Sequence, residues 1–165
     1  MIELIVKNIK KIKNDLELLE KRLGVKISIK EPNQITIEGD SLKEYEAQIV
    51  LDAISFGYPV RTALLLKDEG MVFQKVNIKD VTRRKDLETI KARVIGTQGR
   101  TKRTIENIAD ANLIITGNDV GVICSTDEVD YVITALKNLI RGSKQSNVYN
   151  FLEKINTQKK EIDNE

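Results

Sequence analysis

The chain of 165 residues repeats one order of elements in its two halves, and this repeat limits the fold more than any single motif. Each half contains an apolar segment typical of a strand, a helical region, two alternating segments that predict a hairpin, and an amphipathic helix. The amphipathic helices end near Gly57 and Gly142. Each starts with Ser followed three residues later by Glu, at residues 41–44 and 125–128, which predicts two capping boxes. The repeat therefore predicts an α+β protein of two similar units.

The polar stretch at residues 67–70 predicts the junction, which gives units over residues 1–69 and 70–165. In the first unit, apolar positions 9, 12, 16, 19 and 23 step by three and four, which predicts one helix before the hairpin. We expect Leu42, Tyr45, Ile49 and Ala53 to supply much of the core face of the next helix. In the second unit, the pattern predicts helices over residues 80–95 and 147–159.

Two glycines interrupt the helical region of the second unit only, in the run Gly96-Thr97-Gln98-Gly99 (the glycine loop). The first glycine permits a sharp turn, and the second lets the next helix begin with bare amides, which attract anions. The first turn of that helix carries Arg100, Lys102 and Arg103. The helix dipole disfavours cations there by up to about 1 kcal/mol, an objection that an anionic ligand removes. The loop therefore predicts a phosphate site, and the alternative is a tight turn between two helices.

Composition excludes several other classes of function. A formal charge of +2, from 27 basic and 25 acidic residues, indicates no partner by itself, so any basic surface is local. The chain has one cysteine, Cys124, and no histidine, which leaves no disulfide and no Cys/His metal set. No carboxylate spacing singles out an acid/base pair, so we expect no catalysis, no metal and no cofactor. No apolar segment approaches the roughly 20 residues of a membrane span, and we expect a cytoplasmic protein.

The order strand, helix, Gly-x-x-Gly, helix, hairpin, helix resembles the type I KH module, which binds RNA. Three stretches narrow the resemblance to archaeal tandem-KH ribosome-assembly factors, whose eukaryotic relatives are called partner of Nob and Krr-like proteins. They are GYPVRTALLL at residues 57–66, RVIGTQGRT at residues 93–101 and GSKQSNVYNFLEK at residues 142–154. The resemblance spans nearly the whole chain and implies two KH units in tandem, each a three-stranded sheet with helices packed on one face. The first unit, without a glycine loop and one helix short, is expected to be a degenerate KH domain.

The family resemblance implies a non-catalytic factor that binds 16S rRNA near its 3′ end and assists maturation of the small ribosomal subunit. It also implies proximity to the Nob endonuclease and an association with the alpha subunit of translation initiation factor two. One departure concerns the loop, where the family usually has Lys-Gly and this chain has Thr97-Gln98. A phosphate-directed charge is missing there, so we expect lower affinity or a larger part for Arg93 and Arg100.

We expect single-stranded RNA to cross the glycine loop with its phosphates over the amides of the following helix and its bases toward an apolar groove. Candidates for the groove are Ile95, Ile105 and one face of residues 113–115, and the alternative for these aliphatic residues is plain core. The expected RNA-binding residues are Arg93, Ile95, Gly96, Thr97, Gln98, Gly99, Arg100, Thr101, Lys102, Arg103 and Ile115.

Two further interpretations remain open at the level of sequence. In one, the chain is chiefly an adaptor, whose first unit and final helix dock the endonuclease or the initiation factor while RNA contact is secondary. In the other, it is a KH protein of a different RNA process, such as decay or translational control. Negative charge at Thr97 and Gln98 distinguishes the RNA-binding assembly factor from the adaptor, because it abolishes an RNA-led activity and leaves an adaptor intact.

Overall fold

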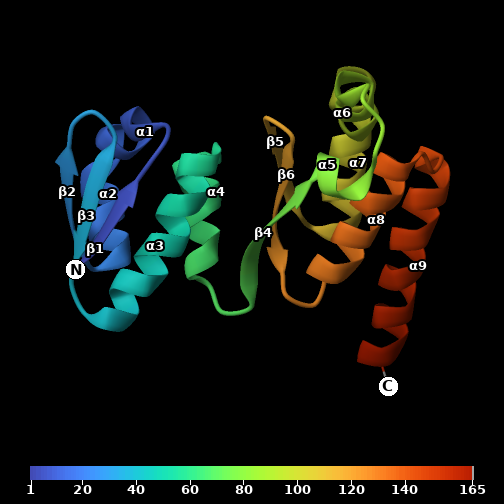
Figure 1. Cartoon of the computed structure of the whole chain (residues 1–165). Helices are drawn as coiled ribbons and strands as arrows, with labels where there is room; N and C mark the ends of the chain where they lie inside the picture. The colour runs from blue at the N-terminus through green and yellow to red at the C-terminus, as the bar shows by residue number, and fades with distance from the viewer. Residues whose placement is uncertain (165) are drawn as a thin grey trace. The chain divides into compact units, whose positions relative to one another are not determined.

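A computed structural model describes residues 1–164 (Figure 1). These residues form two compact units, Met1–Phe73 and a second that begins at Gln74, and the division falls inside strand β4 (Met71–Asn77). Each unit contains one three-stranded sheet with helices. The expected fold class, α+β with two KH-type units in tandem, is confirmed.

The first unit places β3 at the centre of its sheet, in the order β1-β3-β2, with antiparallel pairing on both sides. Its elements are β1 (Ile2–Ile5), α1 (Ile9–Asn14), α2 (Leu16–Leu23), β2 (Lys26–Lys30), β3 (Gln34–Glu38), α3 (Ser41–Phe56), α4 (Val60–Ala63) and the short 3-10 helix η1 (Leu64–Lys67). Ile35 and Ile37 of β3 are fully buried, as are Leu19 of α2 and Leu51 of α3, so the sheet and both helices share one core.

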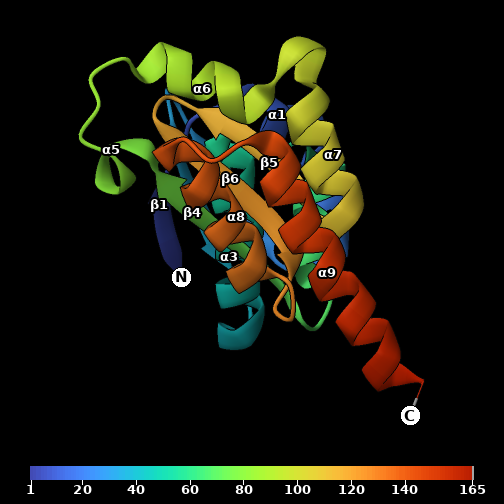
Figure 2. The same ribbon diagram turned by 90° about the vertical axis from the view of Figure 1, so that its right-hand side faces the viewer.

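The second unit repeats this order, with its sheet arranged β4-β6-β5. Its elements after β4 are α5 (Ile78–Val81), α6 (Leu87–Ile95), η2 (Thr97–Gly99), α7 (Arg100–Ala109), β5 (Asn112–Thr116), β6 (Asp119–Ser125), α8 (Val129–Arg141) and α9 (Gln145–Asp163). Figure 2 shows α6, α7, α8 and α9 together on one face of this sheet. The central strand β6 is buried from Val120 to Cys124, and its neighbour β5 pairs with it antiparallel.

The helical region of the first unit differs from the prediction, because it contains two helices instead of one. Asp15, with φ −116° and ψ 26°, separates α1 from α2. The expected loss of a helix was therefore wrong. What the first unit lacks is the loop, since a single residue joins the two helices where the second unit has four.

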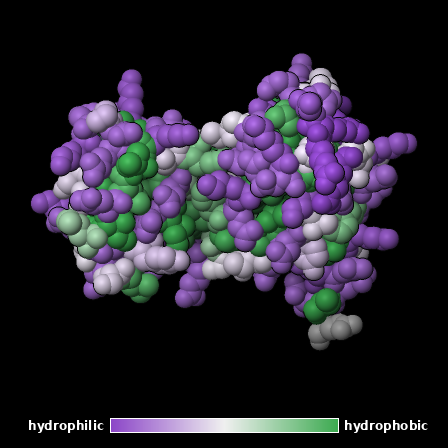
Figure 3. Space-filling model, viewed as in Figure 1, coloured by the Kyte–Doolittle hydropathy of each residue, from purple (hydrophilic) through white to green (hydrophobic). Residues whose placement is uncertain are grey.

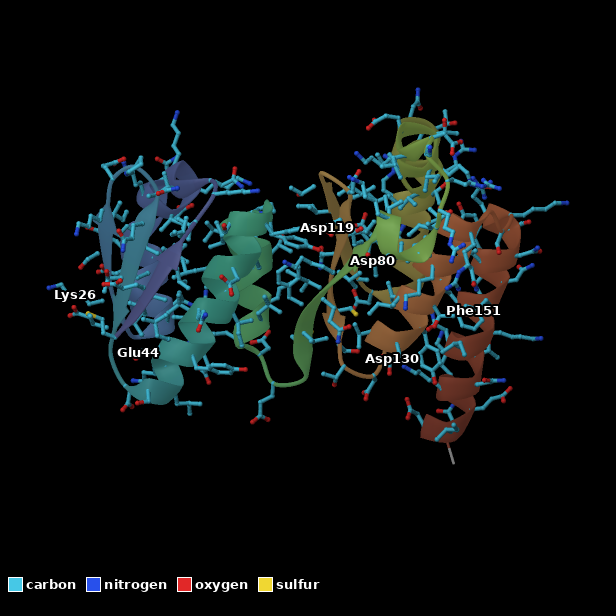
Figure 4. All side chains as sticks on the ribbon, viewed as in Figure 1. Lys26, Glu44, Asp80, Asp119, Asp130 and Phe151 are labelled. Carbon is cyan, nitrogen blue, oxygen red and sulfur yellow. The ribbon has the colours of Figure 1, made fainter. Side chains whose placement is uncertain are left out.

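The core face of α3 was predicted only in part. Ala53 is buried as expected and Ile49 is half-buried, but Leu42 and Tyr45 are 68% and 61% exposed. The other buried apolar residues of the helix are Ala47, Val50, Leu51 and Ile54. The carboxylate of Glu44 (labelled in Figure 4) accepts the Gly39 amide at 2.9 Å and the terminal ammonium of Met1 at 3.1 Å. These contacts turn residue 44 and its helical neighbours inward, which leaves residues 42 and 45 outside.

Neither capping box forms as expected. The residue before α3 is Asp40, and Glu44 accepts the Gly39 amide instead of the amide of Ser41. Residues 125–128 form a turn in which the amide of Glu128 donates to the Ser125 carbonyl at 3.1 Å. The carboxylate of Glu128 binds the ammonium of Lys159 on α9, so it is not available to the backbone. Tertiary contacts replaced local ones at both positions.

The helix predicted over residues 80–95 is interrupted between Val81 and Leu87. The side chain of Asn77 accepts the amide of Lys79 at 2.9 Å and starts the short helix α5. Residues 83–85 are all basic and exposed, so burial does not favour continuing the helix through them. Only residues 87–95 therefore lead into the glycine loop as a helix. Within residues 1–164, no helix combines the length and the apolar character needed to cross a membrane.

Candidate nucleic-acid interface

The glycine loop joins α6 to α7 through a backbone that few residues adopt. Gly96 has φ 78° and ψ 170°, Gln98 has φ 54° and Gly99 has φ 76°. A Cβ atom at Gly96 would lie 2.3 Å from Oγ1 and 2.6 Å from the backbone nitrogen of Thr101, so no side chain fits there. A Cβ atom at Gly99 would meet nothing within 4 Å. Packing therefore requires Gly96, and backbone conformation alone favours Gly99.

The N-terminus of α7 is open to a ligand. No side chain caps this helix, and its first turn holds no acidic residue. The amide of Gly99 is already used by the Gly96 carbonyl at 3.1 Å, which closes the turn just before the helix. The amide of Arg100, the first residue of this ten-residue helix, donates in turn to the Thr97 carbonyl, so only the amides after it can meet a ligand, at the end where the dipole attracts anions.

The four expected cations have different surroundings. Lys102 pairs with Glu106 one turn later at 3.2 Å, and Arg103 donates to the Gln98 carbonyl at 2.9 Å. Arg93 donates from Nη2 to the Ser143 carbonyl, and its buried Nε has no partner. The guanidinium of Arg100 is exposed and makes no hydrogen bond or ion pair with the part of the chain that the structure describes. Arg100 is therefore the cation readiest to bind phosphate, while Arg93 is partly committed to the fold.

The uncharged candidates differ in how exposed their side chains are. Ile95 is 37% exposed and Ile115 is half-buried, so both can contact a ligand. Ile105 is fully buried and Leu113 is 2% exposed, which makes them core residues. Thr101 is 4% exposed, with its hydroxyl directed at Gly96. Thr101 therefore shapes the loop from inside.

A groove of about 440 Å³ opens beside the loop, on the side of α9. It is lined by Thr89, Ala92, Arg93, Gly96, Thr97, Arg100, Thr101, Gln145 and Tyr149. Five of these are expected site residues, and the other four were not predicted. Gln145 and Tyr149 lie about 50 residues from the loop in sequence, so no local pattern brings them to it. In the space-filling view, hydrophilic residues form most of the surface over α5, α6 and α7 (Figure 3).

The outer wall of this groove is held firmly in place. Val148 and Leu152 bury one side of α9, and Phe151 (labelled in Figure 4) packs on Tyr131 of α8 with ring centroids 6.5 Å apart. Further along the helix, Asn156 donates to the Ile108 carbonyl of α7. The position of Tyr149 relative to the loop is therefore set by packing on both α7 and α8.

The described residues show no cluster of three or more His, Cys, Asp or Glu side chains that could hold a metal ion. The thiol of Cys124 is buried, and burial raises its pKa to about 11. It is therefore a small core residue at neutral pH. The chemistry that the loop region supports is binding of an anionic, extended ligand through backbone amides and Arg100.

Among known proteins, the chain is similar to a KH domain-containing protein of Methanocaldococcus jannaschii, with 32% identity over 147 residues. That alignment covers 86% of this chain and 65% of the relative. It is also similar to the pre-rRNA-processing protein PNO1 of Chaetomium thermophilum, with 25% identity over 85% of this chain and 57% of the relative. The chain thus spans less than two thirds of the length of either relative.

A solved structure with a similar fold comes from Pyrococcus horikoshii, in a complex of a/eIF2alpha, aDim2p and rRNA. The match has a TM-score of 0.83 and 26% identity, and it covers 95% of this chain and 94% of that one. Residues 72–157, slightly more than half of the chain, match the family described as eukaryotic type KH-domain, KH-domain type I, in its PNO1 form. The loop, its flanking helices and the sheet order agree with this match, and the chain belongs to the type I KH-domain family as a KH protein of the PNO1 type.

Proposed function

We propose that the second unit grips single-stranded RNA with its glycine loop, and that the chain acts by binding, without catalysis, in cytoplasmic maturation of the small ribosomal subunit. The observation that carries the proposal is the open N-terminus of α7 behind Gly96 and Gly99, with Arg100 exposed beside it. Amides and a flexible guanidinium together suit a phosphate backbone. The relatives support the choice of RNA, since they include a pre-rRNA-processing protein and a complex that contains rRNA.

The RNA that we propose is the 3′ region of 16S rRNA. Phosphates would pass over the α7 amides and Arg100, with Lys102 and Arg103 exchanging their present partners for phosphate. The Lys102–Glu106 pair is a surface pair between neighbouring turns, of a kind that contributes only about 0.3–0.5 kcal/mol, so it yields easily to a ligand. Ile95 and Ile115, both partly exposed, would contact bases.

The test is binding of the chain to a labelled oligonucleotide of its own 16S rRNA 3′ end, followed by fluorescence anisotropy, with a scrambled oligonucleotide beside it. A Thr97→Asp/Gln98→Asp variant adds negative charge to the loop. The chain contains the same residue pair on the exposed side of α9, so Thr157→Asp/Gln158→Asp is a control with matched charge. We expect the loop variant to lose binding and the α9 variant to keep it.

The dependence of the binding constant on salt concentration is a second measurement in the same experiment. Three phosphate contacts predict that log K falls with log salt with a slope of roughly −2, at about −0.7 per contact for a single strand. Equal binding of both oligonucleotides would refute the specificity for the 3′ end, and equal binding by both double variants would remove the loop from the site.

A role as an adaptor is a second candidate, and one feature of the first unit favours it. A groove of about 620 Å³ there is lined by Asp15, Leu18, Arg22, Pro59, Val60, Arg61, Leu64, Leu65 and Asp68. Leu18 and Leu65 are 43% and 37% exposed, and charged residues of both signs surround them. Such a mixed surface suits a protein partner, for which we propose the initiation factor alpha subunit or the Nob endonuclease. Pull-down with a Leu18→Asp/Leu65→Asp variant tests it, because loss of capture would assign the groove to protein.

A further inference from the structure

The groove beside the glycine loop has walls from three helices of the second unit. Thr89, Ala92 and Arg93 lie on one face of α6, and Gln145 and Tyr149 come from the first turns of α9. The rim is formed by Gly96, Thr97, Arg100 and Thr101. No acidic residue lines it, and two arginines do. Ile95 is not among the lining residues, so the groove lies on a different side of α6 from the expected base contact.

The arginines and the tyrosine of this groove suit different parts of one ligand. Arg100 is exposed and available to an anion. Arg93 is anchored by one nitrogen on the Ser143 carbonyl, and its buried Nε has no partner within the described chain. Tyr149 is half-buried, so part of its ring remains accessible, and Gln145 lies one helical turn before it. Arg100 suits a phosphate, Tyr149 suits a flat base, and Gln145 suits the hydrogen-bonding edge of that base. A nucleotide combines these three parts in one ligand.

The dimensions and the continuity of the groove are consistent with this ligand. Its volume of about 440 Å³ falls in the range of roughly 300–1,000 Å³ found for small-molecule sites. Gly96 and Thr97 belong to both the glycine loop and the groove, so a strand that crosses the loop passes its rim. The wall formed by α9 is already ordered by its packing on α7 and α8, which lowers the cost of ordering on binding.

We propose that this groove holds one nucleotide of the bound RNA, with its base stacked on Tyr149 and its phosphate on Arg100. The proposal rests on the proposed function, and it adds a second contact on the side of the loop away from Ile95 and Ile115. Among the described residues the first unit ends with α4 and η1 and has no counterpart of α9. The contact is therefore a property of the second unit, created by the helix that follows its KH fold.

Intrinsic fluorescence tests the stacking directly, because the sequence contains no tryptophan. A Tyr149→Trp variant carries a single indole in the groove, and Asn150→Trp places it one residue along α9 on an exposed position outside the groove. Titration with the 16S 3′-end oligonucleotide should quench the tryptophan fluorescence of Tyr149→Trp and leave that of Asn150→Trp unchanged within error. Quenching of both variants alike, or of neither, would overturn the proposal. So would equal quenching by a free mononucleotide at the same concentration, since that assigns the groove to a small ligand.

Affinity provides the second measurement, with the unaltered chain and the loop variant in parallel. Loss of a stacked base in Tyr149→Ala should weaken RNA binding roughly 5- to 150-fold, whereas Tyr149→Phe keeps the ring and should bind within about 2-fold of the natural chain. If the loop variant loses binding and Tyr149→Ala does not, the groove proposal fails and the proposed function stands. If the unaltered chain does not bind RNA, both fail. Thermal unfolding of each variant checks that the fold is retained.

Discussion

The carboxylate of Glu106 on α7 accepts the backbone amide of Leu113 on β5 at 3.1 Å. The first unit contains the same relationship, since Glu20 on α2 accepts the amide of Ile27 on β2 at 3.2 Å. The partners are seven positions apart in the chain in both cases. The repeat that is visible in the order of elements therefore extends to the side chain that fixes the helix before the hairpin of each unit to its sheet.

Replacing either glutamate should destabilise its unit, because a strand amide loses its acceptor. We expect Glu106→Ala and Glu20→Ala each to lower the free energy of unfolding by about 1–3 kcal/mol. Glu106→Gln should cost less, since the amide oxygen still accepts from Leu113 while the pair with Lys102 is lost. Urea unfolding followed by circular dichroism measures all three. Equal costs for Glu106→Ala and Glu106→Gln would show that the charge, and not the acceptor, matters.

The two loop glycines should respond very differently to alanine. Gly99→Ala meets open space and suffers only from its positive φ, for which we expect about 1 kcal/mol. Gly96→Ala would push a methyl group into Thr101 and should cost clearly more, with loss of RNA binding. Adding Thr101→Ala should not rescue it, because the backbone nitrogen of residue 101 still lies 2.6 Å from the new Cβ. Urea unfolding and anisotropy measure stability and binding, and rescue by the double variant would contradict the geometry.

The glycine loop was predictable from sequence because Gly96 and Gly99 break an apolar pattern where a helix has to turn, and that signal is local. The break at Asp15 was not, since the apolar spacing continues through it and neither glycine nor proline marks it. Periodicity also places Ile105 and Leu113 on an apolar face without telling whether a ligand or the core covers that face.

Contacts between distant segments decided the remainder of the site. Tyr149 reaches the loop only because α9 packs on α7 and α8. The sequence predicts that Glu128 caps a helix, but in the structure its carboxylate binds Lys159, 31 positions later. Sequence periodicity predicts whether a segment forms a helix or a strand, but it gives little information about which elements pack together.

The thiol of Cys124 should be inert in the folded chain. Burial raises its pKa from the usual value of 9.0 to about 11, because the thiolate would lose its hydration. At pH 8 we expect slow labelling by a disulfide reagent, with complete labelling once urea unfolds the chain. Fast labelling without urea would contradict the burial of the side chain.

The same pKa predicts how stability depends on alkaline pH. Between about pH 9 and pH 11 the unfolded thiol ionises while the folded thiol stays protonated, so the unfolded state binds fewer protons and stability falls as pH rises. A Cys124→Ala variant lacks this contribution. Its free energy of unfolding, although lower from the lost packing, should therefore fall less steeply over that range than that of the natural chain. Parallel slopes in urea unfolding series would contradict the prediction.

Arg93 and Arg100 should separate stability from binding. The guanidinium of Arg93 donates to the Ser143 carbonyl and so joins α6 to the turn between α8 and α9, 50 residues away in the chain. Arg93→Gln should therefore lower the free energy of unfolding by about 1–2 kcal/mol, because this partly buried contact is lost. The guanidinium of Arg100 is exposed and has no hydrogen-bond or ion-pair partner among the described residues, so Arg100→Gln should change stability by less than about 0.5 kcal/mol.

RNA binding should respond to the two arginines unequally. Arg100→Gln removes the cation nearest to the open α7 amides, and we expect weaker binding together with a salt slope reduced by about 0.7. Arg93→Gln should also reduce the affinity, but it should reduce the salt slope less than Arg100→Gln does, since the guanidinium of Arg93 is partly committed to the Ser143 carbonyl. Anisotropy over a salt series measures both variants under conditions where each is folded. If Arg93→Gln flattens the slope as much as Arg100→Gln does while the stability of both is unchanged, Arg93 is a phosphate ligand first and a link between helices second.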